Sequence, residues 1–377
     1  MSRKTTAKIK IKGDDFEVID FGPNKVAAFR ELFERVVTDK PLESTDFEVR
    51  AFELFDSCRE RWGKHDDFFA SLGTIWYYLM ERGSYRRADQ LWQFSFELVR
   101  EWELQRDSNR VHKGALYYYW AVTRIIMGDL EAGFLFMHQA LEEDYVTHAG
   151  DVSKSPALAF VRLDYDNENQ FFREKVDEIR AFLSNRIGAY NISRDGDLGL
   201  DEFKRKFLLA KDMRDVVFFF VYQCFRLKAL ADQDSYALEQ NLFGSLMFAN
   251  AAFCMCLVLD SVVARINPNK ERPVFSVQMG FLLRSSGISL SNDDIGEING
   301  SFRNDGFSTT LRKILQSDYI LKNGRSLTAI EGDLAVCYGF RNHGAHKIKA
   351  QPVIYQHFDE ILQRLFNSIF FAVEVLY

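Results

Sequence analysis

The sequence predicts a mainly α-helical protein with one small β-hairpin near its N-terminus. Only 6 prolines occur in 377 residues, which favours helices because proline interrupts the helical hydrogen-bond ladder. Hydrophobic residues make up 47% of the chain and aromatic residues 15%, which is enough apolar surface for packed cores. A chain of 377 residues is longer than one ordinary domain, so we expect two or three domains.

The first part of the chain is predicted from a change of periodicity. Residues 8–21 alternate charged and apolar side chains, which is typical of strands with one buried face. Residues 13–15 supply a turn between the two strands, and residues 22–24 end the hairpin. From residue 25 to about residue 37 the apolar spacing becomes helical. We assign residues 1–45 to this hairpin and helix.

Residues 46–150 are predicted to form antiparallel helix pairs with an internal repeat. A small residue, an aromatic residue, a turn glycine, a large apolar residue and an alanine occur twice in the same order, about 41 to 45 residues apart. The two sets are Gly73, Tyr77, Gly83, Tyr85, Ala88 and Gly114, Tyr118, Gly128, Leu130, Ala132. The pattern resembles tetratricopeptide repeats, which implies a groove for a protein or small-molecule activator. A plain helical bundle with the same glycine turns is the alternative.

Connecting helices are assigned to residues 151–232, and a C-terminal helical bundle to residues 233–377. Residues 242–259 contain no charge over 18 residues, which reaches the length of a membrane-spanning helix. Polar residues inside the stretch and charges beside it favour the central helix of a soluble bundle or a dimer interface, and no membrane association is expected. Residues 285–306 are predicted to be loop-rich, residues 327–346 helical, and the last residues to form an amphipathic helix.

Charge and cysteine content limit the class of protein. The net charge is −6, so a general nucleic-acid coat is excluded and any RNA contact must be a local basic patch. The five cysteines are scattered and lack CxxC spacing, which indicates free thiols and a cytoplasmic location. The N-terminal residues lack the apolar core of a signal peptide.

Residues 335–347 concentrate more chemistry than any other segment. Arg341, Asn342, His343 and His346 lie within six residues at the end of a predicted helix. An arginine can hold a phosphate through its planar fork of donors, and a histidine can move a proton near neutral pH. On a regular helix Arg341 and His346 point about 140° apart, whereas Asn342 and His346 share a face. Gly344 could let the last turn distort.

The arrangement of Arg341, Asn342 and His346 resembles the signature of the HEPN superfamily, over about residues 236–377. These helical domains include metal-independent ribonucleases of bacterial toxin, phage-defence and CRISPR-linked systems. Their motif is an arginine followed after four to six residues by a histidine, and a polar residue commonly comes directly after the arginine. Here the spacer is four residues and the polar residue is Asn342.

The resemblance implies an endoribonuclease that needs no metal and no cofactor. Arg341, His346 and Asn342 are the expected catalytic residues, His343 is a possible helper, and Lys347 and Lys349 are expected to bind RNA. Cleavage is easier with two proton-transfer groups, so we expect a homodimer that brings two copies of the motif together. A protein or small-molecule activator, or an antitoxin, would act at the helical repeats.

A non-catalytic interaction and dimerisation protein is the alternative function. In that case His346 caps a helix, Arg341 pairs with Glu331 or Asp333, and the repeats bind a partner. A metal-dependent hydrolase is disfavoured because no HxH, HExxH or DxD-rich set occurs in the sequence. A phosphate-binding GxxxxGK[ST] loop is also missing from it.

Overall fold

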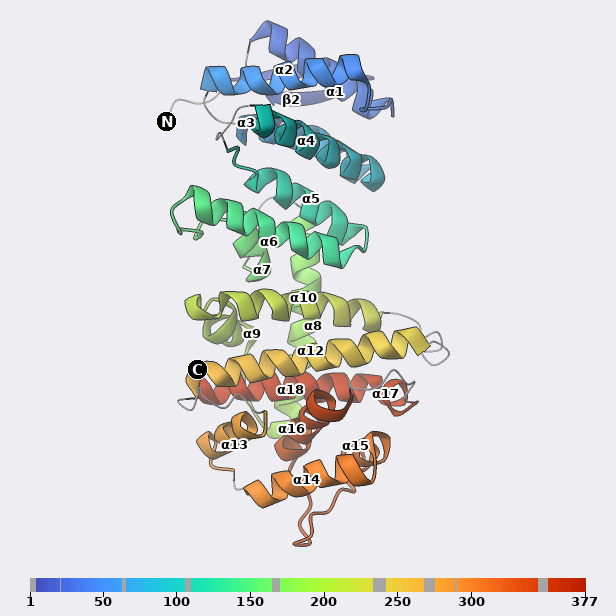
Figure 1. The fold of residues 1–377 in the computed structure, drawn as a ribbon, viewed down its shortest axis with the longest axis vertical. Helices are drawn as coiled ribbons and strands as arrows, with labels where there is room; N and C mark the ends of the chain where they lie inside the picture. The colour runs from blue at the N-terminus through green and yellow to red at the C-terminus, as the bar shows by residue number, and fades with distance from the viewer. Residues whose placement is uncertain are drawn as a thin grey trace. The chain divides into compact units, whose positions relative to one another are not determined.

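The computed structural model confirms the mainly α-helical fold (Figure 1). The chain divides into two compact units, Met1–Ala159 (unit 1) and Phe160–Tyr377 (unit 2). The residues that the structure describes are 5–20, 22–62, 66–105, 110–164, 170–232, 242–267, 275–288, 290–344 and 352–377.

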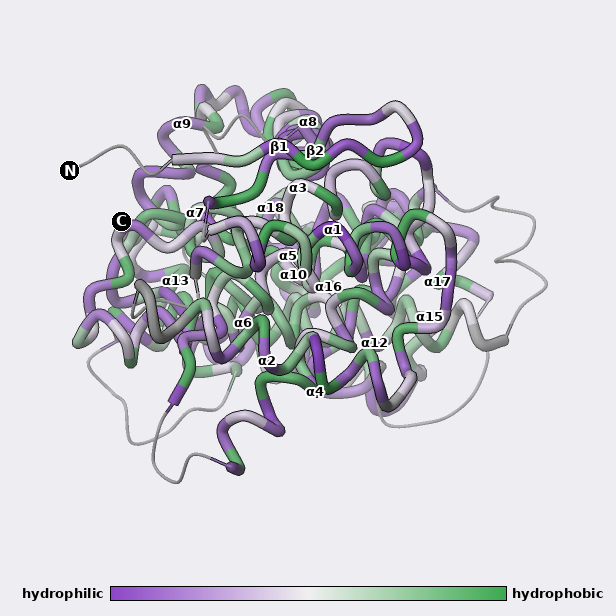
Figure 2. The backbone as a smooth tube through the Cα atoms, turned by 90° about the horizontal axis from the view of Figure 1, so that it is seen from above, coloured by the Kyte–Doolittle hydropathy of each residue, from purple (hydrophilic) through white to green (hydrophobic). Residues whose placement is uncertain are grey.

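Unit 1 begins with the predicted antiparallel hairpin of β1 (Thr6–Ile11) and β2 (Asp14–Ile19). Lys12 and Gly13 form the turn, with φ of 51° and 97°, as a tight two-residue hairpin turn requires at both positions. The turn therefore lies earlier than the predicted residues 13–15. Figure 2 shows hydrophilic and hydrophobic stretches along the hairpin. The buried side chains are Ile9, Ile11, Phe16 and Val18.

The helices of unit 1 follow as successive pairs. Gly83 and Gly128 lie between the helices of two such pairs with φ of 67° and 84°, which confirms the turn role predicted for both glycines. The helices are α1 (Pro23–Val37), α2 (Thr45–Trp62), α3 (Asp66–Glu81), α4 (Tyr85–Gln105), α5 (Gly114–Ile126), α6 (Leu130–Thr147) and α7 (Pro156–Val161), which contains the point of division.

Two kinds of contact hold the middle of unit 1 together. The Asp89 carboxylate on α4 accepts hydrogen bonds from Trp120 Nε1 at 2.7 Å and from Arg124 Nε at 2.6 Å on α5. Helices α5 and α6 approach closely at Gly133, where an added Cβ atom would lie 2.6 Å from Cγ1 of Ile125. The partly buried hydrogen bonds of Asp89 thus join α4 to α5. The lack of a side chain at Gly133 lets α6 pack closely against α5.

Unit 2 is a helical bundle built around α12, α16 and α18. Helix α12 packs against α10 and α18, and α16 packs against α18 (Figure 1). The elements are α8 (Gln170–Arg194), α9 (Leu200–Phe203), the π-helix η1 (Lys204–Leu208), the 3₁₀-helix η2 (Lys211–Met213), α10 (Arg214–Ala231), α12 (Leu242–Ile266), α13 (Phe275–Ser285), α14 (Asn292–Asn304), α15 (Phe307–Leu315), α16 (Ala329–Gly339), the π-helix η3 (Phe340–Gly344), α17 (Pro352–Gln356) and α18 (Phe358–Leu376).

Helix α12 contains the uncharged stretch. Over Leu246–Ile266 it is long and apolar enough to cross a membrane by length and composition alone, with mean hydropathy 2.0. In the structure it packs against α10, α13 and α18, and 56% of its most apolar window is buried. This packing is that of a core helix of the bundle.

The prediction of a loop at residues 285–306 is wrong for Asn292–Asn304, which form α14. Ser291 and Asp294 form a reciprocal capping box at its N-terminus. Ile295, Ile298 and Phe302 then follow at helical spacing and are buried. The other residues of α14 are glycines or polar and are exposed or half-buried, which is why composition alone suggested a loop.

The polar side chains of α16 are buried and paired. Every residue of α16 from Ile330 to Gly339 is buried. Asp333 is 3% exposed, and it accepts hydrogen bonds from Arg364 Nη1 at 3.3 Å and Asn367 Nδ2 at 3.0 Å on α18. Burial raises the pKa of Asp333 to about 6, although Arg364 and Asn367 act to lower it.

We expect Asp333 to make the stability of unit 2 depend on pH. Because its folded pKa is raised, its contribution to stability is fully present below about pH 4 and is lost as the pH rises through about 6. A shift of this size corresponds to about 3 kcal/mol. Urea unfolding of the wild type and Asp333→Asn between pH 4.5 and 7 measures it, because asparagine does not titrate. As the pH rises, the free energy of unfolding of the wild type should fall relative to that of Asp333→Asn. A difference independent of pH would contradict this assignment.

Candidate active site

The motif segment continues directly from α16 as a π-helical turn. Helix α16 begins with a capping box formed by Thr328 and Glu331 and is followed by η3, Phe340–Gly344. Single π-helical turns are rare and occur frequently at functional sites. In a π-helix each hydrogen bond joins residues five apart instead of four, so each residue turns through a smaller angle than in an α-helix. The directions of Arg341, Asn342 and His343 therefore differ from those expected for an α-helix. The expected distortion is therefore present, and it begins before Gly344.

The structure describes three of the predicted site residues. His346, Lys347 and Lys349 lie outside the described residues. Arg341, Asn342 and His343 lie on η3, and each is partly exposed.

Arg341 lies against one face of α12. Its guanidinium carbon is 5.3 Å from the centre of the Phe253 ring. Its Nε atom is buried and, within the described part of the chain, has no hydrogen-bond partner; the same holds for Oδ1 of Asp260. Burial raises the pKa of Asp260, and the charge of Arg341 opposes that rise. Arg341 and Asp260 are thus electrostatic neighbours, and the arginine keeps donor capacity for another group.

Asn342 and His343 are held by other elements. The side chain of Asn342 hydrogen-bonds Tyr338, which opposes the rise that burial causes in the tyrosine pKa. His343 Nε2 lies 3.0 Å from Oδ1 of Asn299 on α14. The His343 ring also stacks on Phe302, with centroids 5.6 Å apart. Arg341 therefore faces α12 whereas His343 faces α14, so these two side chains of one copy are not brought together.

The proposed pairing of Arg341 with Glu331 or Asp333 is wrong. Glu331 is 1% exposed and is bound by Arg325, whose Nη1 lies 2.7 Å from its Oε2. Asp333 is bound by Arg364 and Asn367. Both carboxylates point into the bundle, because α16 is buried on all sides. Arg341 is thus not neutralised by the acids of its own helix.

Sequence reasoning missed the residues that surround Arg341. Asp260 and Phe253 lie about 80 positions before it, and Asn299 lies on a segment expected to be a loop. The available signal was the uncharged stretch of α12 that ends just before Asp260, since a carboxylate with a buried oxygen at such a place needs a nearby cation.

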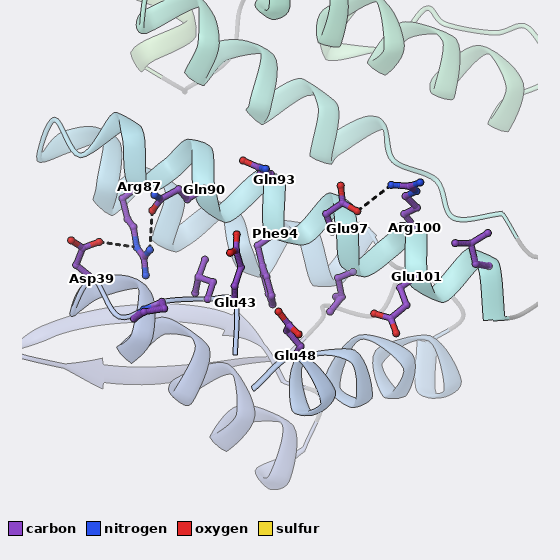
Figure 3. A pocket seen from close by; sticks show the side chains of 14 residues that line it. Asp39, Glu43, Glu48, Arg87, Gln90, Gln93, Phe94, Glu97, Arg100 and Glu101 are labelled. Atoms are coloured by element: carbon purple, nitrogen blue, oxygen red, sulfur yellow. Dashed lines mark hydrogen bonds and ion pairs between the residues drawn. The ribbon is translucent and has the colours of Figure 1, made fainter. Parts of the chain in front are cut away.

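Unit 1 contains a second candidate site, a groove of about 800 Å³ beside α4 (Figure 3). We call it the acidic groove. It contains five carboxylates and two arginines, and each arginine is paired with one of the acids: Arg87 with Asp39 at 3.5 Å and Arg100 with Glu97 at 3.5 Å. Three carboxylates remain after these two pairings, so the groove carries a net negative charge. Its acidic and apolar lining residues are Asp39, Glu43, Glu48, Glu97, Glu101, Pro41, Leu42, Phe94, Leu98 and Leu104.

Comparison with protein-family models, with curated proteins and with solved structures finds no match to this chain.

We expect Gly339 to be essential for the packing that positions η3. An added Cβ atom would lie 2.7 Å from Cε1 of Phe302 and nearer still to its Cζ. Gly339→Ala should therefore lower the free energy of unfolding by about 1–3 kcal/mol. Urea unfolding followed by circular dichroism measures this loss.

Gly296→Ala in α14 is the matched control. An added Cβ atom there meets nothing within 4 Å, so alanine should stabilise the helix by up to about 1 kcal/mol. Equal effects of the two substitutions would show that Gly339 is not required for close packing.

Proposed function

We propose that the chain is a metal-independent endoribonuclease of a phage-defence or toxin type, of the HEPN kind, acting as a homodimer in the cytoplasm. One observation carries the proposal: Arg341 lies on a π-helical turn, partly exposed, and is not neutralised by Glu331 or Asp333. An arginine with donors to spare, close in sequence to two histidines, suits the binding of a phosphodiester.

The proposed reaction requires one base, one acid and a cation. His346 takes the proton of the ribose 2′-hydroxyl, and the resulting oxygen attacks the adjacent phosphorus. Arg341 stabilises the charge that grows on the phosphate oxygens. His346 of the second copy, or a water molecule, protonates the 5′-oxygen as the P–O bond breaks. The products are a 2′,3′-cyclic phosphate and a 5′-hydroxyl.

The surrounding residues have supporting roles in this proposal. Asp260 positions Arg341 through its charge, and Asn342 holds the turn through Tyr338. His343, bound to Asn299 on α14, helps to anchor η3 and orients the segment that leads to His346. Lys347 and Lys349 bind the RNA backbone. A second copy is needed because one copy supplies one Arg–His pair.

Free cysteines support the cytoplasmic part of the proposal. The five cysteines are free thiols, and four of them are buried. Burial also raises the pKa of the Cys58 thiol to about 12, which disfavours the reactive thiolate. Reduced, unreactive cysteines are typical of a reducing compartment.

Cleavage of end-labelled RNA in the presence of EDTA tests the ribonuclease proposal. The wild type should cut and leave a cyclic phosphate. His346→Ala should lower the rate by at least about 100-fold, since it removes a proton-transfer group. Arg341→Ala should lower the rate by about 100- to 1000-fold, since it removes charge stabilisation.

His357→Ala is the matched control, because His357 pairs with Glu360 on the first turn of α18. It should cut like the wild type. Equal cutting by the wild type and His346→Ala would assign the activity to another site or to a contaminant. If dimeric wild type does not cut at any concentration tested, the second function below is favoured.

Partner recognition by unit 1 is the second candidate function, and the acidic groove favours it. The groove combines an apolar floor at Phe94 and Leu98 with an excess of carboxylates. Leu104, which is 73% exposed, adds apolar surface. This combination suits a basic segment that carries one large apolar side chain, and such a partner would be an activator or an antitoxin.

A fluorescent Lys-rich peptide with a central Phe, compared with a Glu-rich version, tests this function. The basic peptide should bind the wild type, and its affinity should fall with added salt. Glu97→Lys with Glu101→Lys should weaken binding on the order of tenfold, since each reversed contact is worth about 1 kcal/mol in water. Glu174→Lys with Asp197→Lys, at two exposed positions outside the groove, is the control for net charge because it also reverses two acids. Equal weakening by this double variant would show that binding is nonspecific.

A further inference from the structure

Three potential metal ligands that the features described so far do not use meet in unit 1. One ligand atom each from His112, Asp144 and His148 lies within 4.8 Å of the others. His112 precedes α5, Asp144 lies in the last turn of α6, and His148 is the C-cap residue of α6. Asp144 and His148 are four residues apart, so they project from the same side of the helix end.

The packing of α5 against α6 builds this cluster. His112 Nε2 lies 2.9 Å from Oδ1 of Asp144. The approach depends on Gly114, because an added Cβ atom there would lie 2.6 Å from each of these two atoms. Asp144 is 8% exposed, so the carboxylate is held by the fold. His148 is exposed and leaves the cluster open to solvent.

The surrounding charges favour a bound cation. Glu143 is bound by Arg110, whose Nη2 lies 2.5 Å from its Oε2. Lys113 Nζ lies 2.7 Å from Glu103 Oε1. These two cations are therefore matched by carboxylates of their own and do not cancel the charge of Asp144. Asp151 is also near enough to His148 for their charges to interact.

We propose that His112, Asp144 and His148 form a divalent transition-metal site of the Zn²⁺ class. Imidazole nitrogens are ligands that Zn²⁺, Co²⁺ and Ni²⁺ prefer and that Mg²⁺ and Ca²⁺ do not, and a carboxylate oxygen is a common further ligand of Zn²⁺. With ligand bonds of about 2.0–2.2 Å, small side-chain rotations bring the three atoms onto one ion. The ion replaces the proton between His112 and Asp144, which is released to solvent. A water molecule fills the fourth position.

The site is distinct from the proposed ribonuclease chemistry. Ribonuclease cleavage is proposed to need no metal and is tested in EDTA, so either proposal can fail without the other. The sequence contains no HxH or HExxH pair that marks this set. Thirty-two positions separate His112 from Asp144, and only the α5–α6 packing joins them.

Titration of metal-free, full-length protein with Co²⁺ at pH 7.5, followed by visible absorption, tests the site. The wild type should bind one equivalent at this site, and added Zn²⁺ should abolish the signal whereas excess Mg²⁺ should not. His148→Ala should weaken binding at least about tenfold. His148 is exposed at a helix end, so its truncation leaves the core intact; Asp144→Asn is the second variant and should weaken binding similarly.

His138→Ala is the matched control, because His138 lies on the same helix and pairs with Glu142 at 3.9 Å. It should bind Co²⁺ like the wild type. The proposal is overturned if the wild type shows no saturable binding. It is equally overturned if His148→Ala binds like the wild type, or if His138→Ala weakens binding as much as His148→Ala.

Discussion

The burial of α16 on every side is the constraint on which unit 2 depends. A helix without an exposed face cannot leave its carboxylates to water, so Glu331 and Asp333 must be paired inside the protein. Arg325 and Arg364 provide this pairing. The same burial brings Phe302 of α14 against Gly339, where no side chain fits. The bundle is therefore organised around the helix that leads into the motif.

The consequence for the motif is that Arg341 is left with donors to spare. It emerges from α16 on a π-helical turn, against the α12 face that carries Phe253 and Asp260. His343 turns to α14 instead. A single copy therefore separates these two side chains. The described part of the motif, Arg341 to His343, follows directly from the buried helix α16, which favours a defined geometry for these residues.

In unit 1 the close packing depends on glycines, one of which lets polar side chains approach each other. Gly114 lets His112 and Asp144 approach each other, and Gly133 lets α6 approach α5. Asp89 fixes α4 to α5 through Trp120 and Arg124. The acidic groove lies beside α4 and presents a charge that suits a basic partner. Under the two proposals, partner binding would belong to unit 1 and RNA cleavage to unit 2, and each unit has its own core.

The sequence by itself determined the helical class, the N-terminal hairpin and the positions of the turn glycines. These features depend on local rules: proline scarcity, apolar periodicity and the backbone freedom of Gly83 and Gly128. It also identified Arg341, Asn342 and His343 as candidate site residues at the end of a helix. Helix α14 was missed because most of its residues are polar or glycine, whereas only three apolar residues are buried.

Only the tertiary structure decided which partners these residues have. The charge of Arg341 acts on Asp260, and His112 meets Asp144, across about 80 and 32 positions of sequence. Such contacts follow from which helix faces pack together, and no local pattern encodes that choice. The partners of Glu331 and Asp333 were also decided by packing, because a helix buried on all sides needs cations from neighbouring elements. Arg325 pairs with Glu331, and Arg364 pairs with Asp333. Sequence therefore supplies the chemical groups, and packing decides which of them act on one another.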